Sequence, residues 1–165
     1  MAGRIYRVGG GASPTTAAEA VVATGAVIKT LVQVGIPANT LIKVLGWGVS
    51  FDASASATPG KVELLMTDVA ATVTSLTPTL WGNPNDLASI CAGGTSLTGY
   101  NASAEGSITA TRVFDAQLVN PTTGYSVFFP LGMQPMVGVS SARYLRIRTT
   151  FGTTVNAYPW ILYEE

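Results

Sequence analysis

The chain has 165 residues, of which 47% are hydrophobic and 11% charged, and its 9 lysines and arginines balance 9 aspartates and glutamates. It contains no histidine and one cysteine, which excludes a Ser-His-Asp triad, an intrachain disulfide and a Cys-His metal cluster. Zero net charge predicts no nucleic-acid partner, and because soluble domains are typically about 25% charged, the shortage of charge predicts a homo-oligomer that buries much of its surface.

The first 14 residues are expected to form a flexible arm, followed by a single domain over residues 15–165. Glycines at positions 9–11 and Pro14 interrupt any regular element there. Arg4 and Arg7 flank Ile5 and Tyr6, so the tip of the arm combines positive charge with apolar surface. These four residues are candidate partner contacts. The alternative is a frayed terminus with no role.

Two strands are predicted next, over residues 27–34 and 42–52. In the second, "IKVLGWGVSFD", period-two alternation places Lys43, Leu45, Trp47, Val49 and Phe51 on a core face. The opposite face should be polar in an antiparallel sheet. It instead carries small and apolar residues, which we predict to lie in a subunit interface: Ile42, Val44, Gly46 and Gly48.

A third strand is predicted over residues 61–68, and a long loop over residues 78–105. Proline, glycine, asparagine and serine are frequent in the loop, and one short helical turn is expected at "NDLASICA". A loop of this length usually has a function or packs against a partner. Trp81 lies in it without a periodic reason to be buried, so we expect it to anchor a ligand or a partner.

The remaining strands are predicted over residues 106–115, 124–132, 142–151 and 154–165. In "RYLRIRTT", Arg146 and Arg148 alternate with Leu145 and Ile147, and we expect the arginines to meet carboxylates across a subunit interface. A nucleic-acid surface is the less favoured alternative for them. Pro159 predicts an edge position or a bulge in the last strand.

Seven or eight strands with little helix predict an all-β protein, an antiparallel β-sandwich and specifically a jelly roll. The uncharged run 116–142 contains three prolines and many polar residues, so no stretch of about 20 apolar residues could span a bilayer, and no membrane partner is expected. No catalytic motif is recognisable, and neither an enzymatic activity, a cofactor nor a metal site is expected. Cys91 is expected to be a small packing residue.

Three motifs carry a resemblance to a known family: GWGVSFD followed by KVELL and TD, then RVFD, and finally YLRIR followed by NA and a proline. On these motifs, roughly residues 20–165 resemble a family of small proteins encoded in the virion gene clusters of tailed phages. The resemblance implies a capsid decoration, cement or minor capsid protein that forms a β-sandwich trimer on the head surface. Its implied partner is the major capsid protein, and its implied location is the virion, after synthesis in the host cytoplasm. The arm lies outside the resemblance.

The sequence therefore leads to one expected function and one alternative. We expect a structural virion protein that binds between capsomers as a homotrimer and stabilises the head. The alternative is a carbohydrate-binding jelly-roll module for adsorption to the host surface, because several tryptophans and tyrosines could stack on sugars.

Overall fold

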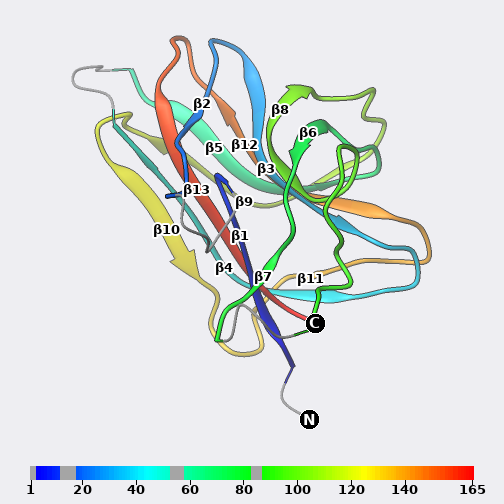
Figure 1. Cartoon of the computed structure of the whole chain (residues 1–165). Helices are drawn as coiled ribbons and strands as arrows, with labels where there is room; N and C mark the ends of the chain where they lie inside the picture. Colours follow the sequence, from blue (N-terminus) through cyan, green and yellow to red (C-terminus); the bar gives the residue numbers. More distant parts are fainter. Residues whose placement is uncertain (1–2, 12–17, 53–57, 83–86) are drawn as a thin grey trace.

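The computed structural model describes residues 3–11, 18–52, 58–82 and 87–165, which form a sandwich of two antiparallel sheets (Figure 1). These residues contain no helix, and hence none long and apolar enough to cross a membrane. The seven-stranded sheet has the order β10 (Gly124–Phe128), β4 (Ile42–Phe51), β13 (Asn156–Glu164), β1 (Ile5–Gly9) and β7 (Thr79–Leu80), while β11 (Met136–Val137) pairs with β4 and β2 (Val22–Ala23) pairs with β13. The six-stranded sheet has the order β6 (Thr72–Ser75), β8 (Gly99–Ala104), β3 (Ile28–Ile36), β12 (Arg143–Thr150), β5 (Gly60–Thr67) and β9 (Thr111–Val119).

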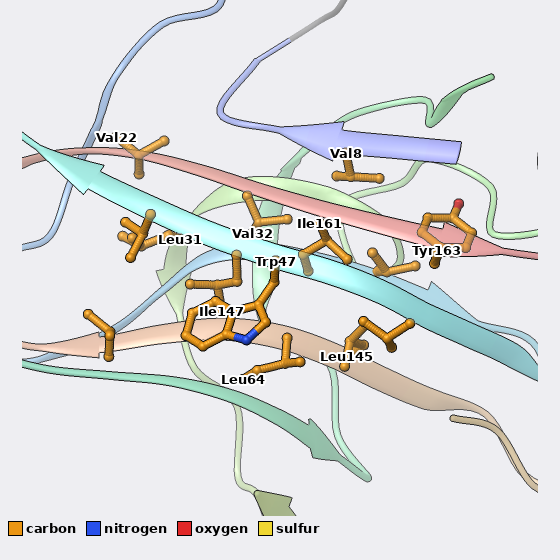
Figure 2. Packing of buried hydrophobic residues seen from close by; sticks show 14 of the residues in the cluster. Val8, Val22, Leu31, Val32, Trp47, Leu64, Leu145, Ile147, Ile161 and Tyr163 are labelled. Carbon is orange, nitrogen blue, oxygen red and sulfur yellow. The ribbon is translucent and has the colours of Figure 1, made fainter. Parts of the chain in front are cut away.

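The predicted all-β sandwich is thus confirmed, whereas the jelly-roll connectivity stays a prediction. The core lies between the two sheets, and Trp47 stands near its middle (Figure 2). Its indole is completely buried, as are Leu145 and Ile147 from the facing sheet. The strict alternation predicted for β12 is therefore confirmed for its inward face. Cys91 belongs to the same cluster and packs there as predicted.

A β-bulge in β4 changes which residues of this strand face the core. Tyr163 of β13 stands opposite Val44, but the preceding Leu162 stands opposite Gly46, so Leu45 is the extra residue. Side chains before the bulge therefore point inward at even positions and those after it at odd positions. Ile42 and Val44 are buried in the chain's own core, and their prediction as subunit-interface residues is wrong.

The prediction of a flexible arm is also wrong for the part of residues 1–14 that the structure describes. Residues 5–9 form β1, which lies between β13 and β7. Tyr6 and Val8 are completely or almost completely buried, and Arg4 exchanges two backbone hydrogen bonds with Glu165. The apolar–polar alternation supplies a core face, and this burial outweighs the freedom of the following glycines. Residues 1–2 and 12–14 of the arm lie outside the described residues.

The predicted long loop contains two strands, and part of it lies over Gln33 on the outer face of the six-stranded sheet. β7 begins at Thr79, and β8 over residues 99–104 pairs with β3. Gln33 on that face is completely buried, and its amide bonds to the backbone of Ala71 and Leu97. Of the expected helical turn, residues 87–92 are not helical, and positions 85 and 86 lie outside the described residues.

Pro159 lies in the central strand β13 rather than at an edge of the sheet. On one side β13 pairs with β4 throughout, with Val49 opposite the proline. On the other side β2 pairs with Asn156 and Ala157, and β1 pairs with residues 160–164. The proline thus falls in the interval between two neighbouring strands, where no ladder partner stands opposite it on that side.

Candidate binding hollow on the seven-stranded sheet

One row of paired residues crosses the outer face of the seven-stranded sheet. Phe128 of β10 stands opposite Gly46 of β4, Gly46 opposite Leu162 of β13, Leu162 opposite Arg7 of β1, and Arg7 opposite Thr79 of β7. Because successive residues of a strand point to opposite faces, this row presents its side chains to the outside, while Tyr163 and Tyr6 point into the core.

Two aromatic rings lie over the glycines of β4. A Cβ atom on Gly46 would come within 2.7 Å of the Phe128 ring, and one on Gly48 within 2.7 Å of Nε1 of Trp160. The two rings are 5.3 Å apart between centroids and are tilted by 35°. The glycines therefore let the rings rest on the backbone. We predicted that Gly46 and Gly48 lie in a subunit interface, but the groups that approach them here are rings of the same chain.

Trp81 forms the opposite wall of the hollow. Its backbone N–H donates to the carbonyl of Ile5 at 2.7 Å, directly after β7, which fixes its position beside β1. The side chain stays 59% exposed. This tryptophan belongs to no core cluster, in keeping with the absence of a periodic reason for burial, and its role as an anchor stays a prediction.

Arg7 supplies the charge of the hollow, and its charge is balanced within the chain. Its guanidinium makes a two-pronged ion pair with Glu19, in which Nη2 lies 3.0 Å from Oε2 and Nη1 bonds to Oε1. The hydroxyl of Tyr158 donates to the same carboxylate. The hydrogen bond to Glu19 raises the pKa of Arg7, while burial and then the bond to Glu19 raise the pKa of Tyr158. At neutral pH the trio therefore holds one positive and one negative charge.

Together these side chains enclose an open hollow of about 370 Å³, within the size range of ligand sites. Leu162 is only 7% exposed. The lining is largely apolar apart from Arg7 and consists of Arg7, Trp81, Phe128, Trp160 and Leu162. The arrangement can bind a small molecule that offers both an apolar face and hydrogen-bonding groups.

The other predicted contact residues are dispersed. Tyr6 is buried, stacks on Tyr163 and donates its hydroxyl to the carbonyl of Leu87. It cannot serve as a surface anchor. Arg4 remains exposed and Ile5 half-buried, outside the lining of the hollow.

Arg146 and Arg148 find their carboxylates within the chain. Arg146 is completely buried and donates to the backbone and side chain of Glu105 and to the carbonyl of Val69. Arg148 pairs with Glu63 at 2.7 Å. Their prediction as subunit-interface residues is wrong, because Arg146 meets the segments that follow β5 and β8, and Arg148 meets its cross-strand neighbour Glu63 within β5.

A second exposed surface lies on the segment between β10 and β12. Four large apolar side chains of this segment, which we call the 131–139 patch, are exposed by 45–94%: Leu131, Met133, Met136 and Val139. Sequence reasoning gave this segment no binding role, and it extended the strand before it to residue 132, whereas β10 ends at Phe128. The signal for it was the uncharged run 116–142 with closely spaced methionines.

Phe128 and Leu162 were not predicted as site residues, and Trp160 was considered only among the tryptophans and tyrosines that could stack on sugars. A signal existed: Gly46 and Gly48 are spaced to lie on one face of a strand, and glycines in a strand often mark a close approach of another group. The sequence does not say which rings approach them, because that depends on the pairing of β4 with β10 and β13. In the described part of the chain, no three His, Cys, Asp or Glu residues cluster as a metal site would require.

Comparisons with known proteins identify no family. No family model matches the chain, and no curated protein matches it. A solved chain titled "Structure of infectious bursal disease virus Gx strain" aligns with a TM-score of 0.19 at 16% identity, over 99% of this chain and 40% of that one. The chain thus spans well under half of that protein's length, and a likeness this weak carries no argument.

Proposed function

We propose that the protein is a structural virion protein that assembles as a homotrimer and stabilises the capsid of a tailed phage by binding between capsomers. The observation that supports an assembly role is the 131–139 patch. Leu131 is 94% and Met133 71% exposed. Exposed large apolar side chains that gather in one segment are typical of protein–protein contact surfaces. The resemblance of the motifs to phage virion proteins supplies the identity of the partner.

The proposed mechanism requires no chemical step. A protein that binds only the assembled shell stabilises that shell by mass action, by an amount that grows with its concentration relative to the dissociation constant. Self-association through an apolar surface presents several copies at once, and linked copies bind a repetitive lattice more tightly than single ones. The low charge of the chain suits a protein that is permanently assembled.

Sedimentation equilibrium at micromolar concentration tests the assembly step. The native protein should sediment as a trimer of its 17.0 kDa chain, and a double variant Leu131→Ser, Met133→Ser should shift toward the monomer. The matched control is Leu118→Ser, because Leu118 is also 75% exposed but lies on β9. A monomeric native protein, or a loss of assembly only in the control, would show that this surface has another role.

Co-sedimentation with phage heads tests the capsid step. The native protein should pellet with mature heads, and the number of copies bound per head should reach a fixed value at saturation. The double variant should bind more weakly because it loses multivalency. A trimer that does not bind heads at any salt concentration would contradict the capsid role. It would not contradict the proposal that the protein self-associates through the 131–139 patch.

A further inference from the structure

We propose that the hollow between Trp81 and the Phe128–Trp160 pair is a binding site for a neutral saccharide. The argument begins with its shape. Its lining comes from three strands, β1, β10 and β13, and from the residue after β7. These strands belong to one sheet (Figure 1), whose paired backbone holds the lining residues in place. Sites built on strands hold their side chains more firmly than sites on loops.

Two of the aromatic residues that line the hollow are largely exposed. Trp81 is 59% and Phe128 64% exposed, so packing within the sandwich leaves most of each side chain uncovered. Trp160 rests on Gly48, and Phe128 on Gly46, so neither ring must be reordered when a ligand arrives. Pre-organised aromatic surfaces bind at low entropic cost.

Charge in the hollow selects against ions. The guanidinium of Arg7 would repel a cation such as a quaternary ammonium group, which otherwise favours aromatic cages. The carboxylate of Glu19, already joined to Arg7, offsets the attraction for an anion. A neutral ligand is therefore favoured.

Polar groups at the edge favour a saccharide over an apolar side chain. An arginine has five N–H donors in a rigid fork, and two of its terminal nitrogens already hold Glu19, so donors remain where Arg7 lines the hollow. A pyranose ring carries C–H groups on its flat face and hydroxyls around its edge. The first fit the aromatic walls and the second fit the guanidinium. This site is separate from the 131–139 patch and does not depend on the proposed assembly.

Titration of the native protein with neutral oligosaccharides tests this inference. The probes are maltohexaose, cellohexaose, hexa-N-acetylchitohexaose and galactotetraose, each up to about 10 mM, with tryptophan fluorescence and saturation-transfer NMR as readouts. We expect at least one probe to bind. Trp81→Ala should weaken it by about tenfold or more, as the loss of one stacking ring predicts. Arg7→Lys should weaken it several-fold, because lysine lacks the fork.

Two controls make the result decisive. Leu118→Ala, on the other sheet, should leave the saccharide affinity unchanged, and the thermal midpoint of Trp81→Ala should match the native one because its ring is exposed. A decaproline peptide probes the competing occupant, since aromatic grooves also bind proline-rich segments. The inference is overturned if no saccharide binds, if binding survives Trp81→Ala, or if only the peptide binds in a Trp81-dependent way. Loss of trimer assembly in Leu131→Ser, Met133→Ser with saccharide binding retained would separate the two proposals.

Discussion

The indole N–H of Trp47 on β4 donates a hydrogen bond of 3.2 Å to the carboxylate of Asp115 on β9, and so joins the two sheets. The same oxygen accepts the hydroxyl of Tyr125 from β10 at 2.8 Å. Trp47 is completely buried, and a buried indole N–H requires an acceptor. One carboxylate therefore satisfies donors from two strands of the opposite sheet, at the side where β9 and β10 follow each other in the chain.

Replacing this carboxylate should destabilise the sandwich. Asp115→Ala leaves the N–H of Trp47 without its acceptor, and we expect a loss of about 1–3 kcal/mol in the free energy of unfolding. Asp115→Asn keeps an acceptor oxygen and should lose less. Urea unfolding followed by tryptophan fluorescence measures both. If the free energy of unfolding of Asp115→Ala lies within about 0.5 kcal/mol of the native value, as for surface substitutions, the hydrogen bond does not stabilise the fold.

The glycines under the aromatic pair should tolerate no side chain. In Gly48→Ala the new methyl group would lie 2.7 Å from Trp160 and 2.8 Å from Ser126, so the ring must move and stability should fall by about 1–3 kcal/mol. Gly152→Ala is the matched control, because its new methyl group would have no atom within 4 Å. Equal unfolding midpoints for the two variants would contradict the close packing described for Gly48.

Local sequence pattern predicted much of this strand architecture. β4 was predicted over residues 42–52 and is found over 42–51, because β-branched and aromatic residues at period two indicate a strand directly. The orientation of Ile42 and Val44 was missed for a non-local reason. The bulge at Leu45 arises in the ladder with β13, more than 100 residues further along the chain, and no residue in β4 itself announces it.

The predictions for the arm and for the arginines of β12 were wrong for related reasons. β1 is only five residues long, and its alternation of Tyr6 and Val8 with Arg7 was outweighed in the prediction by the glycines that follow. The inward face of β12 was predicted correctly, yet Arg146 pairs with Glu105 from a loop that period-two patterns do not place. Only Arg7 and Trp81 of the candidate site were predicted as contact residues, since the hollow joins residues from the beginning, middle and end of the chain.

Arg146 should be indispensable to the layer that covers the six-stranded sheet. Arg146→Ala removes the cation beside Glu105, which keeps its hydrogen bonds to Thr30, and leaves the carbonyl of Val69 without this donor. Because the side chain of Glu105 is 24% exposed, we expect a loss of about 3 kcal/mol, the lower end for a broken buried ion pair. Arg146→Lys should recover only part of this, because one ammonium group lacks the fork. Arg143→Ala is the control, since the side chain of Arg143 bonds to its chain neighbours Ser141 and Ala142. Equal losses at both positions in urea unfolding would contradict the assigned role.

Asp68 should make the protein sensitive to acid. Its carboxylate accepts the hydroxyl of Thr109 and the backbone N–H of Ala110 at 3.0 Å, and these bonds lower its pKa from 3.8 to about 2. Because the folded-state pKa is lowered, the stabilisation is present above pH 3.8 and is lost as the pH falls toward 2. Unfolding midpoints measured between neutral pH and pH 2 should fall less steeply for Asp68→Asn than for the native protein. Thr109→Val should lie between them, and identical slopes for all three would contradict the assignment.

The single thiol should be unreactive in the folded protein. Cys91 is completely buried, and burial, with the nearby charge of Glu165 as a smaller cause, raises its pKa to about 12. Because the thiolate is the reactive form, a disulfide reagent at mildly alkaline pH should label Cys91 only as fast as the chain opens. Thr153→Cys provides the control, since residue 153 is exposed and should be labelled within the mixing time. Cys91→Ser should also lower stability, because it places a hydroxyl in the apolar cluster. Rapid labelling of the native protein at Cys91 would mean that the segment around it opens far more readily than its packing against Tyr163 and Ser89 implies.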